Sequence, residues 1–275
     1  MKKNVLLTGL ISALLIAGML FTACPTDSGE PSGLSAPDPG DLPDLPDAAG
    51  VTPVGTTAEA KALLNGIKDN YSGIRGNVEA LIINKVVPNS SGRTWNVKDD
   101  TSLPGLKINA QGNYTETSTI REDTIPKAGD YMEISENRDA SVEVTGDRTE
   151  KEMTFYKGSR IAEKEEGYVK VTIKSMSAAN ASITITESAN ASYVYGLTVS
   201  HNGKDGKIIL DAHAKGSLTK TMTVSSFDVD LPSMEITYSG SLCVYGADDK
   251  EVVYREDITN EREFVAALGY FGIDY

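Results

Sequence analysis

The sequence predicts a mainly β protein of the α+β class, built around a large curved antiparallel meander sheet or a partly open barrel. From about residue 106 onward, apolar and polar residues alternate with a period of two, as in strands with one buried face. Turn signals such as Asn202-Gly203 separate the alternating runs. No proline occurs between Pro126 and Pro232, which suits a continuous ladder of strands.

The alternating runs predict the individual strands. The clearest run covers 168–175, and further runs lie at 182–186, 193–200, 208–215 and 234–244. We expect roughly eight to ten strands, and a sheet of this width must curl, close or be covered because its apolar face and its edges are otherwise exposed.

A helix is expected at each end of the sheet. Thr56 and Glu59 have the spacing of a capping box, and an amphipathic helix over 57–70 would follow. Its apolar stripe consists of Leu63, Leu64, Ile67 and Tyr71. The apolar run at 78–87 fits either a second short helix that passes into a strand or a first strand. Asn260 can cap a short C-terminal helix.

Residues 25–56 differ sharply in composition from the rest of the chain. They hold seven of the eleven prolines and six acidic residues, with no lysine or arginine. Such a segment favours an extended tether over a packed core, with a reach of up to about 100 Å. A disordered leader of no particular length fits the same composition. We therefore divide the chain into a signal peptide (1–23), a disordered tether beginning at a lipidated residue (24–56) and a single β-rich domain (57–275).

The amino terminus has the pattern of a cleaved export signal. Lys2 and Lys3 precede an apolar run over 5–20, which is short of the roughly 20 residues that span a bilayer as a helix. Phe21-Thr22-Ala23-Cys24 then ends the run, and here the chain resembles a bacterial lipoprotein precursor. Phe21 departs from the leucine usual in that family, which makes the motif similar to the looser ones of spirochaetes.

The resemblance implies that Cys24 is the lipidation site. Its acyl chains, such as palmitate, would anchor an exported protein to the membrane of the cell envelope. Pro25 follows Cys24 in place of the aspartate that retains some lipoproteins at the inner membrane, which favours the outer membrane. The alternative is an ordinary soluble signal cleaved near Ala23.

Composition and motifs exclude several classes of function. A net charge of −13 and a pI near 4.7 argue against a nucleic-acid partner. His201 and His213 lie too far apart along the predicted hairpin to share a metal ion. Cys243 has no local base and is expected to be a structural, unreactive thiol. Because the motifs of common catalytic sites are absent, we expect no enzyme activity and no cofactor or bound metal.

Two weaker signals allow other chemistry. Asp228 with Asp230, and Asp248 with Asp249, could contribute to a calcium site, although charge in a solvated turn is the commoner explanation. His213 shares a strand face with Asp211, but no nucleophile is evident beside it, so a solvated polar face is the simpler interpretation.

The candidate ligand-binding residues are Tyr193, Tyr195 and Tyr238 on the apolar sheet face, with Leu63 and Ile67 on the covering helix. An aromatic-lined apolar face could hold an acyl chain. A packed core with tyrosine hydroxyls at its rim is the alternative.

Together these observations favour a non-enzymatic lipoprotein of the cell envelope. It would act as a binding or structural module on a tether, with an unidentified protein, glycan or lipid of the envelope or exterior as partner. The alternative is a carrier or chaperone of lipid-like ligands, because the order of anchor, linker, helix and curved sheet is similar to that of half-barrel envelope lipoprotein carriers. An apolar cavity beneath the helix would favour the carrier, and a filled core with a polar exterior the binding module.

Overall fold

A computed structural model describes residues 34–46, 50–121, 126–177, 180–225, 233–247 and 249–273. The gaps between residues 50 and 273 all fall between strands. Cys24 and the signal, together with Asp228, Asp230 and Asp248, lie outside the described residues.

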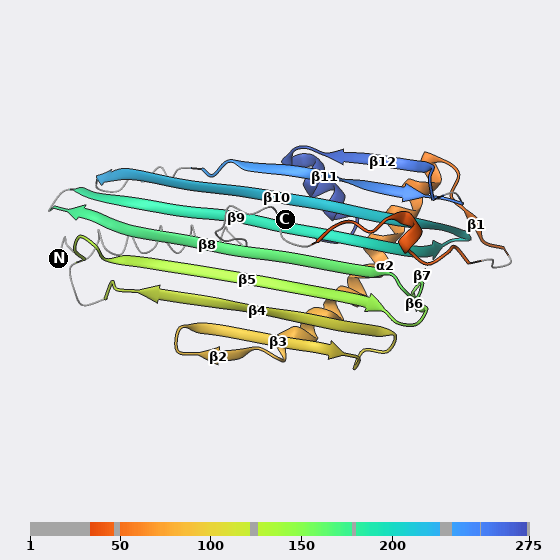
Figure 1. The fold of residues 1–275 in the computed structure, drawn as a ribbon, viewed down its shortest axis with the longest axis horizontal. Helices are drawn as coiled ribbons and strands as arrows, with labels where there is room; N and C mark the ends of the chain where they lie inside the picture. The colour runs from red at the N-terminus through yellow and green to blue at the C-terminus, as the bar shows by residue number, and fades with distance from the viewer. Residues whose placement is uncertain are drawn as a thin grey trace.

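A twelve-stranded open sheet forms most of the molecule (Figure 1). The strands are β1 (Thr52–Pro53), β2 (Val87–Asn89), β3 (Gly92–Asp100), β4 (Leu106–Ser118), β5 (Tyr131–Val144), β6 (Arg148–Glu150), β7 (Met153–Phe155), β8 (Arg160–Met176), β9 (Asn180–His201), β10 (Lys204–Ser225), β11 (Ile236–Tyr245) and β12 (Val252–Ile258). Their main order is β12-β11-β10-β9-β8-β5-β4-β3-β2, so β2 and β12 are the edges and the sheet does not close into a barrel. The predicted mainly β fold with a large antiparallel sheet is confirmed.

The order is a meander with one interruption. The small hairpin β6–β7 lies between β5 and β8 in sequence, and β7 pairs with the end of β9. All neighbouring strands are antiparallel except β1, which runs parallel to β10.

The long hairpin β9–β10 is the centre of the sheet. Asn202 and Gly203 form its turn, both with positive φ (51° and 74°), which is the backbone conformation that a tight two-residue hairpin needs. Each strand has 22 residues, so the runs predicted separately at 182–186 and 193–200 belong to one strand. His213 faces Ser192 across this hairpin.

The N-terminal helix is longer than the sequence predicts. Helix α2 runs from Thr57 to Ile83 without a break, so it includes most of the apolar run at 78–87, and only Val87 enters strand β2. The predicted cap is present, because the Thr56 side chain accepts a hydrogen bond from the Glu59 amide (3.3 Å). The Glu59 carboxylate accepts from the amide of Gly55 (2.8 Å).

The short C-terminal helix α3 (Glu261–Gly269) begins at the predicted cap. Asn260 Oδ1 accepts a hydrogen bond from the Glu263 amide (3.1 Å). Phe264, Ala267 and Leu268 are fully buried against the sheet. The helix therefore covers β10, β11 and β12, of which β10 and β12 also contact α2.

The predicted disordered tether is wrong for the part of it that the structure describes. Segment 34–46 contains the short 3-10 helix η1 (Pro39–Asp41) and lies against the sheet, with Leu42 buried. Lys207 Nζ, itself buried, donates to the carbonyls of Pro39 (3.1 Å) and Leu42 (3.4 Å). Proline and aspartate do prevent a regular helix here, but partners far away in the sequence hold the extended chain in place.

The fold has three layers, with the sheet in the middle (Figure 1). We call the side that packs on α2 and α3 the helix face; it includes the odd-numbered residues of β8 and β9 and the even-numbered residues of β5 and β10. We call the other side the polar face, and segment 34–46 lies on it. No helix in the described part of the chain is both long and apolar enough to cross a membrane.

Candidate functional site

The five residues predicted to bind a ligand do come together on the helix face. Tyr193, Tyr195, Leu63 and Ile67 are each at most 2% exposed, and Tyr238 is half-buried. Aromatic side chains of the helices and the C-terminal segment fill the space above the tyrosines. The ring centroid of Tyr195 lies 4.8 Å from that of Phe271 and 6.3 Å from that of Tyr71. Tyr193 and Tyr238 both pack on Phe264, at 6.0 and 5.2 Å. This region is a packed aromatic core.

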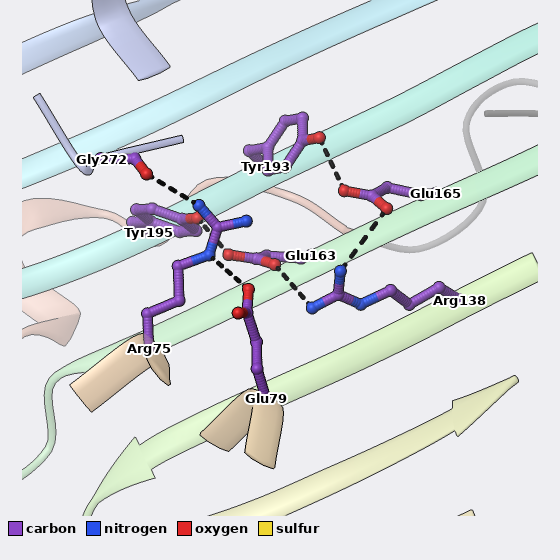
Figure 2. A network of polar contacts seen from close by, with 8 residues as sticks. All are labelled: Arg75, Glu79, Arg138, Glu163, Glu165, Tyr193, Tyr195 and Gly272. Carbon is purple, nitrogen blue, oxygen red and sulfur yellow. Dashed lines mark hydrogen bonds and ion pairs between the residues drawn. The ribbon is translucent and has the colours of Figure 1, made fainter. Parts of the chain in front are cut away.

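A polar network lies beside this core, between α2 and the sheet (Figure 2). Two of its carboxylates, Glu163 and Glu165 on β8, accept hydrogen bonds from the hydroxyls of Tyr195 (2.5 Å) and Tyr193 (2.7 Å). Arg138 on β5 lies near both carboxylates, at 3.7 and 3.8 Å, distances that give electrostatic attraction without a good hydrogen bond.

Helix α2 places Arg75 beside this network, where the charge of Arg75 acts on Glu163 (Figure 2). Arg75 Nη1 donates to the carbonyl of Gly272 (3.1 Å), just beyond α3, and Arg75 Nε lies 3.0 Å from the Glu79 carboxylate. One side chain therefore connects the N-terminal helix to the C-terminal segment.

Burial dominates the electrostatics of the network. It raises the pKa of Glu163, while the Tyr195 hydrogen bond and the charges of Arg138 and Arg75 act in the opposite direction. Burial and the nearby Glu163 carboxylate raise the pKa of the Tyr195 hydroxyl well above its usual range. The tyrosine therefore stays a proton donor at neutral pH.

Sequence reasoning missed this network, although a signal was present. Positions 163, 165 and 138 fall on the apolar side of their strands by period two, yet they carry charges. Charges at such positions indicate a buried network.

The polar face carries two parallel rows of polar side chains, each crossing seven strands. The first polar row is Asn96, Gln111, Asp139, Lys164, Ser192, His213 and Ser239, which are opposite one another in register from β3 to β11. The second polar row is Thr94, Asn113, Asn137, Glu166, Asn190, Lys215 and Thr237. Neighbours within a row are about 4.8 Å apart, the spacing of adjacent strands.

An open groove of about 730 Å³ follows these rows from β2 to β8. Its lining includes polar-face side chains of four strands and Lys85 from the turn after α2; the polar-face residues include Asn96, Gln111, Asn113, Asn137, Asp139, Lys164 and Glu166. Asn137 Oδ1 accepts a hydrogen bond from the backbone amide of Asn113 (3.2 Å). Lys164 pairs with Glu166 (2.9 Å). Within the described part of the chain, the side-chain amides of Asn96 and Asn113 make no hydrogen bond, so they are available to a ligand.

The register also places a serine beside His213, which the sequence did not indicate. The imidazole contacts Ser192 Oγ through Nδ1 (2.9 Å) and Asp211 Oδ1 through Nε2 (2.8 Å). Ser192 lies in the middle of β9, between β8 and β10, where backbone amides belong to the strand ladder. Acyl transfer also needs free amides or other donors to stabilise an oxyanion, and a ladder supplies none at this position. We interpret the trio as hydrogen-bonded side chains of the polar face, with Ser192 and His213 in the first polar row and Asp211 beside it.

The other residues considered in the sequence are dispersed. His201 lies on the helix face under Gly66 of α2, on the opposite side of the sheet from His213. Cys243 is buried, and its Sγ lies 3.8 Å from Ser241 Oγ. Among the described residues, no group of three or more histidine, cysteine or acidic side chains could hold a metal ion.

A second apolar cluster lies on the helix face at the far ends of β8 and β9. It consists of Val171, Ile173, Ile183 and Ile185, and the described residues that pack on it come from strands and one loop, without any helix residue. Glu187 follows on the same strand face, 7% exposed, and its Oε2 has no hydrogen-bond partner among the described residues. Burial raises the pKa of this carboxyl.

Comparisons with known proteins return no match: no family model, no curated protein and no solved structure is similar to this chain.

Proposed function

We propose that the chain is an exported, non-enzymatic lipoprotein of the cell envelope, anchored on the outer membrane through Cys24, that binds its partner with the polar face of its sheet. One observation carries the binding role: the groove that follows the two polar rows, where hydrogen-bonding side chains are exposed on a rigid sheet. Rigid strands hold such groups with little loss of entropy on binding.

The packing of the helix face supports binding by the polar face over carriage of a lipid-like ligand. A carrier needs an apolar cavity beneath its helix, whereas here Tyr195, Phe271 and Ile67 occupy that space and are fully buried. Arg75 on α2 then fixes that helix to the C-terminal segment at Gly272, and Glu163 pairs with Tyr195 within the sheet. Opening this interface would expose paired charges and aromatic rings together, at a cost of several kcal/mol.

Carriage of a lipid-like ligand is the second candidate, favoured by the second apolar cluster and by the buried Glu187, whose Oε2 has no partner among the described residues. A buried carboxyl beside aliphatic side chains suits an acyl chain with a hydrogen-bonding head. Mass spectrometry under native conditions separates the candidates, because stoichiometric co-purifying lipid would favour the carrier.

The anchor is tested with a Cys24→Ser variant. We expect the protein to move from the membrane fraction to the soluble fraction on cell fractionation, because two or more acyl chains are needed for stable attachment. Cys243→Ser is the matched control and should stay in the membrane fraction. Membrane retention of Cys24→Ser would contradict anchoring at this residue.

The binding face is tested by photo-crosslinking in cells. A benzophenone side chain at Asn137, in the groove, should crosslink to envelope material, whereas the same group at Asn77, on the exposed side of α2, should not. Equal crosslinking from both positions, or none from Asn137, would contradict a binding role for the polar face.

A further inference from the structure

We propose that the groove on the polar face binds a linear, uncharged glycan that lies across the strands, along the two polar rows. This inference rests on the proposed binding role of that face and specifies its ligand. Three features of the groove favour this class of ligand. They are its side-chain amides, the regular spacing of its polar rows and the balance of its charged side chains.

The first argument concerns hydrogen-bonding capacity. A sugar hydroxyl both donates and accepts, and a carboxamide is the side chain that offers a donor and an acceptor side by side. Asn96, Gln111, Asn113 and Asn137 place four carboxamides on three adjacent strands of the groove. Asn96 is exposed and Asn113 half-exposed, and neither amide group has a protein partner among the described residues.

The second argument is geometric. Each polar row repeats at the strand spacing of about 4.8 Å, and this is close to the length of one sugar ring along an extended glycan. Alternate residues within a strand are about 6.6 Å apart, so the two rows can contact the two edges of one chain of rings. From β3 to β8 each row offers four positions in register.

The third argument is charge. The chain carries a net charge of −13, which disfavours anionic polymers such as nucleic acids or sulfated glycans. Within the groove, however, Lys85 and Lys164 balance Asp139 and Glu166, and Lys164 and Glu166 already pair with each other. Arg138 also lines the groove, but its charge faces Glu163 and Glu165 on the helix face. A neutral ligand meets no unbalanced charge there.

Tyr168 lies next to the β8 end of the groove, to the side of the second polar row. Tyr168 is half-buried on the polar face, two residues beyond Glu166 on β8 and opposite Ser135 and Ser188. An aromatic ring there gives the apolar side of a sugar ring a surface on which to pack. The groove thus combines amides along its length with one aromatic residue beside its end.

The test uses titration calorimetry on the full-length protein. The ligands are three neutral linear hexasaccharides: cellohexaose, chitohexaose and maltohexaose. We expect at least one to bind with a dissociation constant below about 1 mM. Asn96→Ala and Asn113→Ala should each weaken that binding by about threefold to tenfold, the loss expected for one hydrogen bond. Asn77→Ala on α2 is the matched control and should bind as the unchanged protein does.

Three results would overturn the inference. The first is that no hexasaccharide binds at roughly 5 mM ligand. The second is that the Asn96→Ala/Asn113→Ala double variant, with an unchanged circular-dichroism spectrum, binds as the unchanged protein does. The third is that heparin binds more tightly than the hexasaccharides and in a salt-dependent way. In each case crosslinking from Asn137 still reports separately on the binding face, so a wrong ligand class is distinguished from a wrong face.

Discussion

Two buried glutamates on neighbouring strands show how the surroundings of a residue decide its energetic role. Glu163 is paired with the Tyr195 hydroxyl and lies near Arg138, so its charge is compensated. Glu187 is equally buried, but one of its oxygens has no partner in the described chain. Burial raises the pKa of both carboxyls, and only Glu163 has charges that oppose the rise.

We therefore expect Glu187→Gln to stabilise the protein by about 1 kcal/mol at pH 7.5, the lower range for an unsatisfied buried group. Because the folded pKa is raised, the carboxyl costs stability as pH rises from its unfolded pKa through its folded pKa. The advantage of glutamine should thus disappear below about pH 4.3. Urea unfolding at pH 7.5 and pH 4 measures both values.

The matched substitution Glu163→Gln should have a smaller effect. It removes a buried charge but also the charge that faces Arg138, so the two contributions offset each other, and we expect a gain below about 0.5 kcal/mol at pH 7.5. Equal effects of the two substitutions at pH 7.5 would contradict the distinction between a paired and an unpaired carboxyl.

At the scale of elements, docking of segment 34–46 depends on Gly196 of β9, which has no side chain. A Cβ atom at Gly196 would lie 2.6 Å from Pro37 Cγ and 2.7 Å from Leu42 Cδ2, inside normal contact distance. Thr198 and Lys207 complete the contact, with hydrogen bonds to the carbonyls of Pro43 (3.0 Å) and Pro39.

Gly196→Ala should loosen this segment and leave the helix face unchanged, because the added methyl group points toward the polar face. We expect amide hydrogen exchange in 34–46 to accelerate about tenfold, equivalent to about 1.4 kcal/mol of local stability. Gly76→Ala, where a Cβ meets nothing within 4 Å, is the control. Unchanged exchange in 34–46 would show that the segment does not depend on close approach at Gly196.

The same elements show what the sequence could predict. Period two located the strands because the polar face is solvated, and the capping spacing located both helix starts at Thr56 and Asn260. The docked segment could not be predicted, since its contacts with Gly196 and Lys207 are more than 150 residues away. The groove was likewise hidden, because the register across β3, β4, β5 and β8 decides which polar residues share a row.

At the scale of the whole molecule, an open sheet must protect its two edges from pairing with other chains. Strand β2 is three residues long and contains Pro88, which has no amide to donate to another strand. Strand β12 carries Arg255 and Asp257, which pair with each other (2.7 Å) on the exposed side. Val87, 60% exposed on β2, makes that edge the more vulnerable of the two.

Pro88→Val should therefore promote self-association through β2, because it restores an amide donor and adds a β-branched residue to an exposed edge. Sedimentation velocity at increasing protein concentration should show larger species for the variant than for the unchanged chain. Identical sedimentation of the two proteins would contradict the protective role of this proline. Val252→Thr on β12 is the control, with no change expected.

The docked segment 34–46 also limits the distance between the domain and a membrane to which Cys24 is anchored. Only ten Cα–Cα steps separate Cys24 from Leu34, the first described residue, and a stretched chain of that length covers about 35 Å. An acyl group on Cys24 would thus keep Leu34 within about 35 Å of the lipid surface. Since the segment departs from the polar face, the groove would sample a thin zone next to the membrane, and polymers located further away would be beyond its reach.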